Sequence, residues 1–110
     1  MKELMKPLTS LEEFEVLYKK DTTTMFVFSA NWCPDCVFIE AFMPKLIQKY
    51  SQIEFIYVDR DAFIDLSQGL GIMGIPSFLA IRSSKEIGRF VSKLRKSEAE
   101  IDRFFAEVSA

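Results

Sequence analysis

Two continuous apolar runs, separated by a helical pattern, constrain the fold of this chain most strongly. Residues 24–30, "TMFVFSA", and residues 53–59, "IEFIYVD", are rich in strand-forming residues, and both predict strands buried inside a sheet. Between them, residues 34–50 carry a broad apolar stripe at helical spacing, which Pro44 should kink or break near its middle. A strand, a helix and a second strand in this order are typical of a parallel βαβ unit.

The remaining segments extend this unit in both directions. The pairs Ser10 with Glu13 and Ser97 with Glu100 are capping-box patterns, and each predicts the start of a helix. Residues 61–70 predict a short helix. Residues 77–82 and 87–91 predict two strands joined as a hairpin by "SSKE". We therefore predict one α/β domain over residues 1–110, with a central mixed sheet of four to five strands flanked by helices.

The composition excludes several classes of function. The chain has 110 residues, a net charge of −2 and no long basic run, so nothing favours nucleic acid or an anionic membrane surface as a partner. It has no run of about 18 apolar residues that would span a membrane. The N-terminal segment "MKELMKPLTSLEEF" is charged throughout and does not resemble a secretory signal. We therefore expect a cytoplasmic protein.

The absence of histidine restricts the chemistry further. It excludes a Ser-His or Cys-His catalytic pair and any zinc site that needs imidazole. The chain has two cysteines, which cannot complete a four-sulfur zinc site alone. A metal would need carboxylates or a second copy of the protein, so we expect no metal and no bound cofactor in the single chain.

The two cysteines lie in "SANWCPDCVF", residues 29–38, at the turn from the first apolar strand into the helix that follows. In α/β sheets, sites lie beyond the carboxyl ends of the parallel strands. A helix N-terminus stabilises a thiolate, which favours Cys33 as an attacking group. Cys36 lies one turn further on, so its sulfur can reach that of Cys33 and form a disulfide. The spacing predicts that Cys33 attacks a disulfide and that Cys36 resolves the mixed disulfide.

Other interpretations of the cysteine pair stay open at this point. The thiols could belong to a non-catalytic binding module or serve as a redox sensor. They could hold an iron–sulfur cluster between two copies of the chain. They could also be inert buried thiols, because free cysteine behaves as a small hydrophobic residue.

Three motifs give the chain a resemblance to the thioredoxin family. "NWCPDC" follows the first strand, "YVDRD" ends the next one, and "GIMGIPSF" precedes the hairpin. Their order and spacing are similar to those of the redox motif, the middle strand and the cis-proline loop of thioredoxins. The resemblance runs from about Leu8 to the C-terminus. It implies a thioredoxin fold, a thiol–disulfide oxidoreductase activity and a cis peptide bond between Ile75 and Pro76.

The resemblance also implies a site and its partners. Disulfide-containing proteins or small molecules would be the substrates, and a reductase or a low-molecular-weight thiol would supply electrons to a monomeric enzyme. The catalytic residues would be Cys33 and Cys36. The substrate-binding residues would be Trp32, Pro34, Asp35, Ile75 and Pro76.

The sequence departs from thioredoxins inside and behind the motif. Thioredoxins have Gly-Pro between the cysteines, whereas this chain has Pro34-Asp35. The resemblance implies that Val27 replaces a buried aspartate and that Phe55 replaces its lysine partner, so Cys36 lacks the usual proton acceptor. Asp35 is therefore a candidate proton relay for Cys36, and the alternative is a solvated charge at the helix N-terminus.

Overall fold

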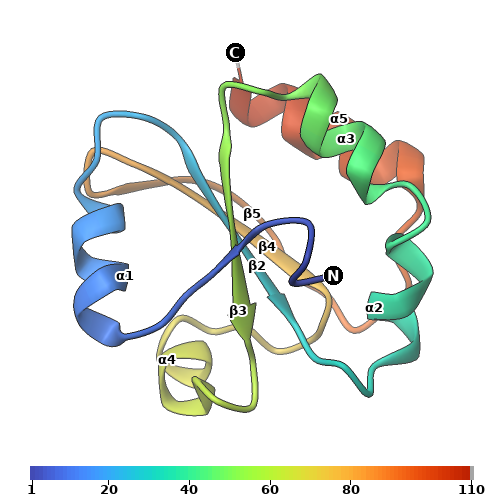
Figure 1. Cartoon of the computed structure of the whole chain (residues 1–110), viewed down its shortest axis with the longest axis horizontal. Coiled ribbons are helices and arrows are strands. Elements are labelled where there is room, and N and C mark those ends of the chain that lie inside the picture. The colour runs from blue at the N-terminus through green and yellow to red at the C-terminus, as the bar shows by residue number, and fades with distance from the viewer. Residues whose placement is uncertain (110) are drawn as a thin grey trace.

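The central element of the computed structural model, which describes residues 1–109, is a five-stranded sheet of order β1-β3-β2-β4-β5 (Figure 1). The first three strands run parallel, β4 is antiparallel to β2, and β5 is antiparallel to β4. The predicted mixed sheet is thus confirmed. Its strands are β1 (Lys6–Pro7), β2 (Thr24–Ser29), β3 (Glu54–Asp59), β4 (Ser77–Arg82) and β5 (Lys85–Phe90).

Five helices cover the two faces of the sheet (Figure 1). The helices α1 and α4 lie on one face, and α2, α3 and α5 lie on the other. Within residues 1–109, no helix has the length and hydrophobicity of a membrane span. The helices are α1 (Leu11–Tyr18), α2 (Pro34–Ile39), α3 (Met43–Lys49), α4 (Ile64–Gly69) and α5 (Glu98–Ser109).

Each face of the sheet carries its own hydrophobic core. The core under α2, α3 and α5 contains both cysteines and is built largely on aromatic rings. Phe105 lies at its centre, with ring centroids 5.3 Å from Phe55 and 5.4 Å from Phe78. Such aromatic pairs stabilise a core beyond the area that they bury. The cysteine pair therefore belongs to an apolar layer that contains these rings.

The helix signals in the sequence are confirmed at both capping boxes. The Ser10 hydroxyl accepts a hydrogen bond from the Glu13 N–H at 3.1 Å, and the Ser97 hydroxyl accepts one from the Glu100 N–H at 3.2 Å. The predicted helix over residues 34–50 is broken into α2 and α3, as Pro44 suggested. Proline has no N–H to donate, and its ring clashes with the carbonyl four residues earlier, which is where α2 ends.

Two features differ from the sequence prediction. The strand β1 was not predicted, because its two residues are too few to show a pattern and one of them is proline. The strand β5 begins at Lys85 and not at residue 87, because the hairpin turn is shorter than "SSKE" suggested. Ser83 and Ser84 have φ values of 52° and 63°, in the left-handed region that a tight hairpin turn requires. Their N–H groups donate to carbonyls of residues 20 and 18, so a tertiary contact holds a turn that serine does not favour.

The contact between β5 and α5 predicts a packing-dependent loss of stability. A Cβ atom at Gly88 would lie 2.8 Å from Val108 Cγ1 and 3.2 Å from a ring carbon of Phe104. We expect Gly88→Ala to lower the free energy of unfolding by about 1–3 kcal/mol in urea denaturation, because overpacking forces the helix away. Gly69→Ala is the matched control, since nothing lies within 4 Å of a Cβ atom there. Equal stability of the two variants would contradict this description of the packing.

Candidate active site

The two cysteines meet at the N-terminus of α2. Cys33 is the N-cap residue of this helix, and its Sγ accepts a hydrogen bond from the Cys36 N–H at 3.2 Å. Both side chains are buried and both are free thiols. An N–H directed at the Cys33 sulfur supplies a donor for negative charge that develops on this atom during a reaction. Pro34 begins the helix, where its missing N–H costs nothing.

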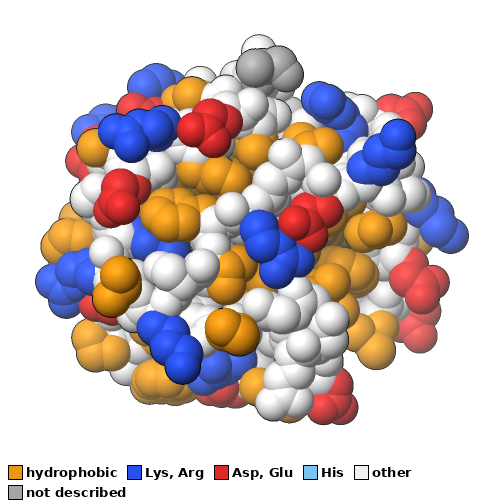
Figure 2. Space-filling model, turned by 180° about the vertical axis from the view of Figure 1, so that it is seen from behind, with side chains coloured by type: hydrophobic (Ala, Val, Ile, Leu, Met, Phe, Trp, Pro, Cys, Tyr) orange, Lys and Arg blue, Asp and Glu red, His pale blue; other side chains and the backbone are white. Residues whose placement is uncertain are grey.

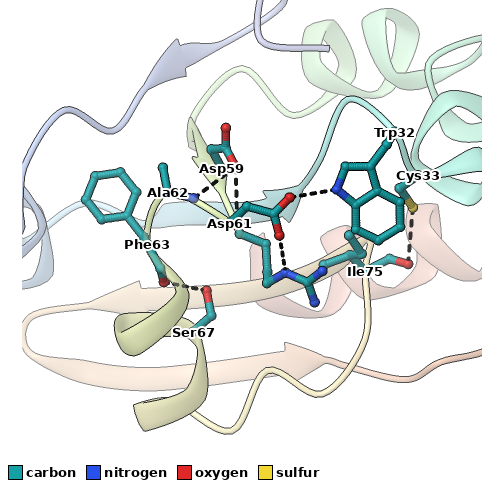
Figure 3. Close-up of polar contacts among 9 residues, drawn as sticks. Trp32, Cys33, Asp59, Asp61, Ala62, Phe63, Ser67 and Ile75 are labelled. Carbon is teal, nitrogen blue, oxygen red and sulfur yellow. Dashed lines mark hydrogen bonds and ion pairs between the residues drawn. The ribbon is translucent and has the colours of Figure 1, made fainter.

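The segment around Pro76 faces Cys33 from the other side. The Ile75–Pro76 peptide bond is cis, and the Ile75 carbonyl oxygen lies 3.7 Å from Cys33 Sγ (Figure 3). Pro76 is buried and Ile75 is half-buried. The structure therefore places the Ile75 carbonyl next to the Cys33 sulfur, and Pro76 directly follows Ile75.

Trp32 lies at the open edge of the site and is held by charged groups. Its side chain is 62% exposed, and its Nε1–H donates to Asp61 Oδ2 at 2.6 Å (Figure 3). Arg60 donates from Nε to the other oxygen of Asp61 at 3.0 Å, and its guanidinium lies 5.5 Å from the Trp32 ring centroid. Sequence reasoning missed both partners, although the "YVDRD" motif contains them.

Two exposed apolar side chains lie in segments that adjoin site residues in sequence, and the sequence analysis did not single them out. Met73 is 72% exposed and directly precedes Gly74, and Leu94 is 78% exposed in the segment between β5 and α5. On the face opposite to the view of Figure 1, charges of both signs are interspersed with such hydrophobic side chains (Figure 2). The only available signal would have been an isolated hydrophobic residue in a polar loop, which is too common to be informative.

Asp35 forms an ion pair that could not be predicted from local sequence. Its Oδ1 lies 2.8 Å from the Nε of Arg95, which follows β5. The same guanidinium lies 4.4 Å from the ring centroid of Phe38, so an aromatic side chain of α2 helps to position it. The carboxylate between the two cysteines therefore has a cation of its own, which offsets its repulsion of a thiolate.

Cys36 lies in an environment that opposes ionisation. Burial, together with its hydrogen bond to Cys33, raises the pKa of the Cys36 thiol to about 12, while the Ser29 hydroxyl acts in the opposite direction. Val27 and Phe55 are buried in the same core cluster as both cysteines. At these two positions the core offers Cys36 neither an acid nor a lysine.

The described residues provide no ligand set for a metal ion. Within residues 1–109, no three histidine, cysteine, aspartate or glutamate side chains are grouped closely enough to hold one. The two thiols would need ligands from elsewhere to bind a metal.

Comparison with known proteins identifies the family. The family model described as Thioredoxin matches residues 6–107. Thioredoxin from Rattus norvegicus is 30% identical over 104 residues, which cover 92% of this chain and 99% of the rat protein. Mitochondrial thioredoxin-2 from Schizosaccharomyces pombe is 29% identical over 82 residues, or 74% of this chain, and the match spans only 62% of the length of that relative.

A solved structure agrees in fold. Thioredoxin from Trypanosoma brucei brucei superposes with a TM-score of 0.83 over 94% of this chain and 89% of that one, at 23% sequence identity. This likeness concerns the fold alone, whereas the family model covers nearly the whole chain. The chain therefore belongs to the thioredoxin family.

Proposed function

We propose that this chain is a thiol–disulfide oxidoreductase that reduces disulfides of proteins or small molecules through its Cys33/Cys36 pair. The observation that carries the proposal is the hydrogen bond from the Cys36 N–H to Cys33 Sγ at the start of α2. It directs a backbone donor at the sulfur of Cys33 and holds Cys36 one helical turn away. Membership of the thioredoxin family supports the same activity.

The reaction follows from the order of the two sulfurs. The Cys33 thiolate attacks one sulfur of the substrate disulfide, and the other substrate sulfur leaves as a thiolate that takes up a proton. Cys36 then loses its proton and attacks Cys33 Sγ. A disulfide forms between the two cysteines, and the second substrate sulfur leaves. The substrate gains two electrons and two protons, which the pair regains from an external thiol or reductase.

The surfaces beside Cys33 supply the contacts for a substrate. We assign Trp32, Pro34 and Ile75 to the apolar side of this surface, with Pro76 fixing the backbone next to the sulfur. Trp32 and Pro34 are exposed, and Ile75 is half-buried with its carbonyl toward Cys33. An extended peptide that carries a disulfide would lie along this surface.

We further propose that residues 1–110 work as one monomeric domain in the cytoplasm. The electron donor would be a thioredoxin reductase or a low-molecular-weight thiol. Membership of the thioredoxin family supports disulfides as the substrates. The identity of the substrate and the location of the protein in the cell stay predictions. Two of the relatives with similar sequences are mitochondrial thioredoxins.

Trapping of a mixed disulfide tests the assignment of the two sulfurs. We expect Cys36→Ser to retain attack by Cys33 and to accumulate a covalent complex with disulfide-containing substrates such as insulin, because the resolving thiol is missing. Non-reducing electrophoresis and mass spectrometry would locate the bond at Cys33. Cys33→Ser is the control and should trap nothing.

Insulin reduction separates this function from a non-catalytic module. The wild-type chain should accelerate precipitation of insulin by dithiothreitol, and both single variants should lose this activity. A chain that binds partners or senses oxidation without turnover would leave the precipitation rate unchanged, which would contradict the proposal.

The ion pair with Arg95 predicts a limited role for Asp35. We assign Asp35 as a paired charge at the helix N-terminus and not as the proton relay of Cys36. Asp35→Asn should therefore change turnover in insulin reduction by less than about threefold at any pH near neutrality. Asp65→Asn, at an exposed position of α4, is the matched control for loss of one charge. A decrease of about tenfold with an altered pH profile would instead identify Asp35 as the relay.

The raised pKa of Cys36 predicts a pH dependence for the resolving step. The thiol is protonated at neutral pH, so the reactive thiolate fraction should grow about tenfold for each pH unit. We expect the second, slower release of 4-thiopyridone from 4,4′-dithiodipyridine to accelerate accordingly when stopped-flow traces are recorded at increasing pH. A second phase that is independent of pH would contradict rate-limiting ionisation of Cys36.

A further inference from the structure

Lys96 carries a buried ammonium in the segment between β5 and α5. Its side chain is 1% exposed, and its Nζ donates to the carbonyls of Ser92 at 3.1 Å and Leu94 at 3.4 Å. The ring centroid of Phe90 lies 5.3 Å away. Among residues 1–109, none of the ion pairs includes Lys96. A fully buried lysine without a carboxylate partner is rare, because burial of an unpaired charge is costly.

The segment that contains Lys96 contacts both halves of the site. Ser92, whose carbonyl accepts from Lys96, lies against Gly74: a Cβ atom at Gly74 would come within 2.2 Å of Ser92 O. Gly74 directly precedes Ile75, whose carbonyl faces Cys33. Arg95, the neighbour of Lys96, binds Asp35 between the cysteines. The loop between β5 and α5, which holds the ammonium, thus contacts both the residue before Ile75 and Asp35 of α2.

Four negative or ionisable groups, Asp35, Glu100 and the two cysteines, interact electrostatically with this ammonium, and two of them already have partners. Asp35 is paired with Arg95 at 2.8 Å. Glu100 accepts hydrogen bonds from the N–H and hydroxyl of Ser97, each at 3.0 Å, as part of the cap of α5. The remaining two are the cysteine sulfurs. Burial lowers the pKa of Lys96, and the charges of Asp35, the cysteines and Glu100 oppose that shift.

We propose that Lys96 is a positioning residue for the resolving step, with its buried ammonium stabilising the thiolate that forms on Cys36. The inference rests on the proposed function. In the mixed disulfide Cys33 carries no charge, so Cys36 is the sulfur left to ionise. Its proton goes to solvent, and Lys96 stays protonated throughout. An opposite charge near a thiol favours its ionised form. This effect would oppose the burial in the apolar core, which disfavours ionisation of Cys36.

Two-phase kinetics with 4,4′-dithiodipyridine test the inference. This probe has no charge at neutral pH, so a lysine does not attract it. The first release of 4-thiopyridone reports attack by Cys33, and the second reports resolution by Cys36. We expect Lys96→Met to slow the second phase about tenfold, with a smaller change in the first. Lys96→Arg should restore the second phase, and Lys93→Met, at an exposed position of the same loop, should leave both unchanged.

The outcomes are distinguishable. Absence of a second phase in the wild-type chain would overturn the proposed function itself. A wild-type chain with two phases and a Lys96→Met variant with the same two rates would overturn the role of Lys96. Equal slowing of both phases would do so too, because it would indicate a general structural loss. Should Lys96→Met fail to fold, a folded Lys96→Arg variant with a slow second phase would contradict the proposal, since it keeps the charge.

Discussion

The register of β2 against its two neighbours determines where every part of the site lies. Ser29, at the end of β2, is paired with Asp59 of β3, and Phe28 is paired with Ser77 of β4. The chain that leaves β2 toward the cysteines therefore runs between the end of β3 and the segment before β4. The contact of Trp32 with Asp61 and that of Cys33 with the Ile75 carbonyl both follow from this register. A slip by one residue would reverse the faces of β2 and separate these groups.

The fold was predictable wherever a local pattern carries it. The apolar runs predicted β2 and β3, the capping boxes predicted the starts of α1 and α5, and Pro44 predicted the break between α2 and α3. The pattern failed for β1, which has two residues, and for the hairpin turn, which depends on contacts with the end of α1. Tertiary hydrogen bonds leave no signal in the sequence around the turn that they stabilise.

The site was predictable at the cysteine pair and at the Ile75–Pro76 segment. The spacing of Cys33 and Cys36 and the resemblance around Pro76 are readable because neighbouring residues carry them. The cations are different, because Arg95 is 60 residues from Asp35 in sequence and reaches it from a loop that also contains Lys96. A basic residue in "SKLRKS" would ordinarily be expected to face solvent, so its burial cannot be inferred without the packing of Phe90 and Ser92 around it.

The positively charged side chains of Arg95 and Lys96 come from a loop and not from the sheet. The core behind Cys36 is apolar at Val27 and Phe55, and positive charge enters instead from the loop that follows β5. Arg95 is paired with Asp35, and the buried Lys96 beside it is the cation that we propose to act on Cys36. The group that we propose to favour ionisation of Cys36, Lys96, therefore lies in the loop between β5 and α5 and not in the sheet. Residues of such a loop can vary without changing the core.

The central claim is that Cys33 and Cys36 form one reversible two-electron couple. Equilibration with glutathione buffers, followed by the fluorescence of Trp32, the only tryptophan of the chain, measures this most directly. The account predicts a single transition between dithiol and disulfide that fits a two-electron couple, with mass spectrometry showing the loss of two hydrogens and no retained glutathione. Independent glutathionylation of the two cysteines, without an intramolecular disulfide, would contradict it.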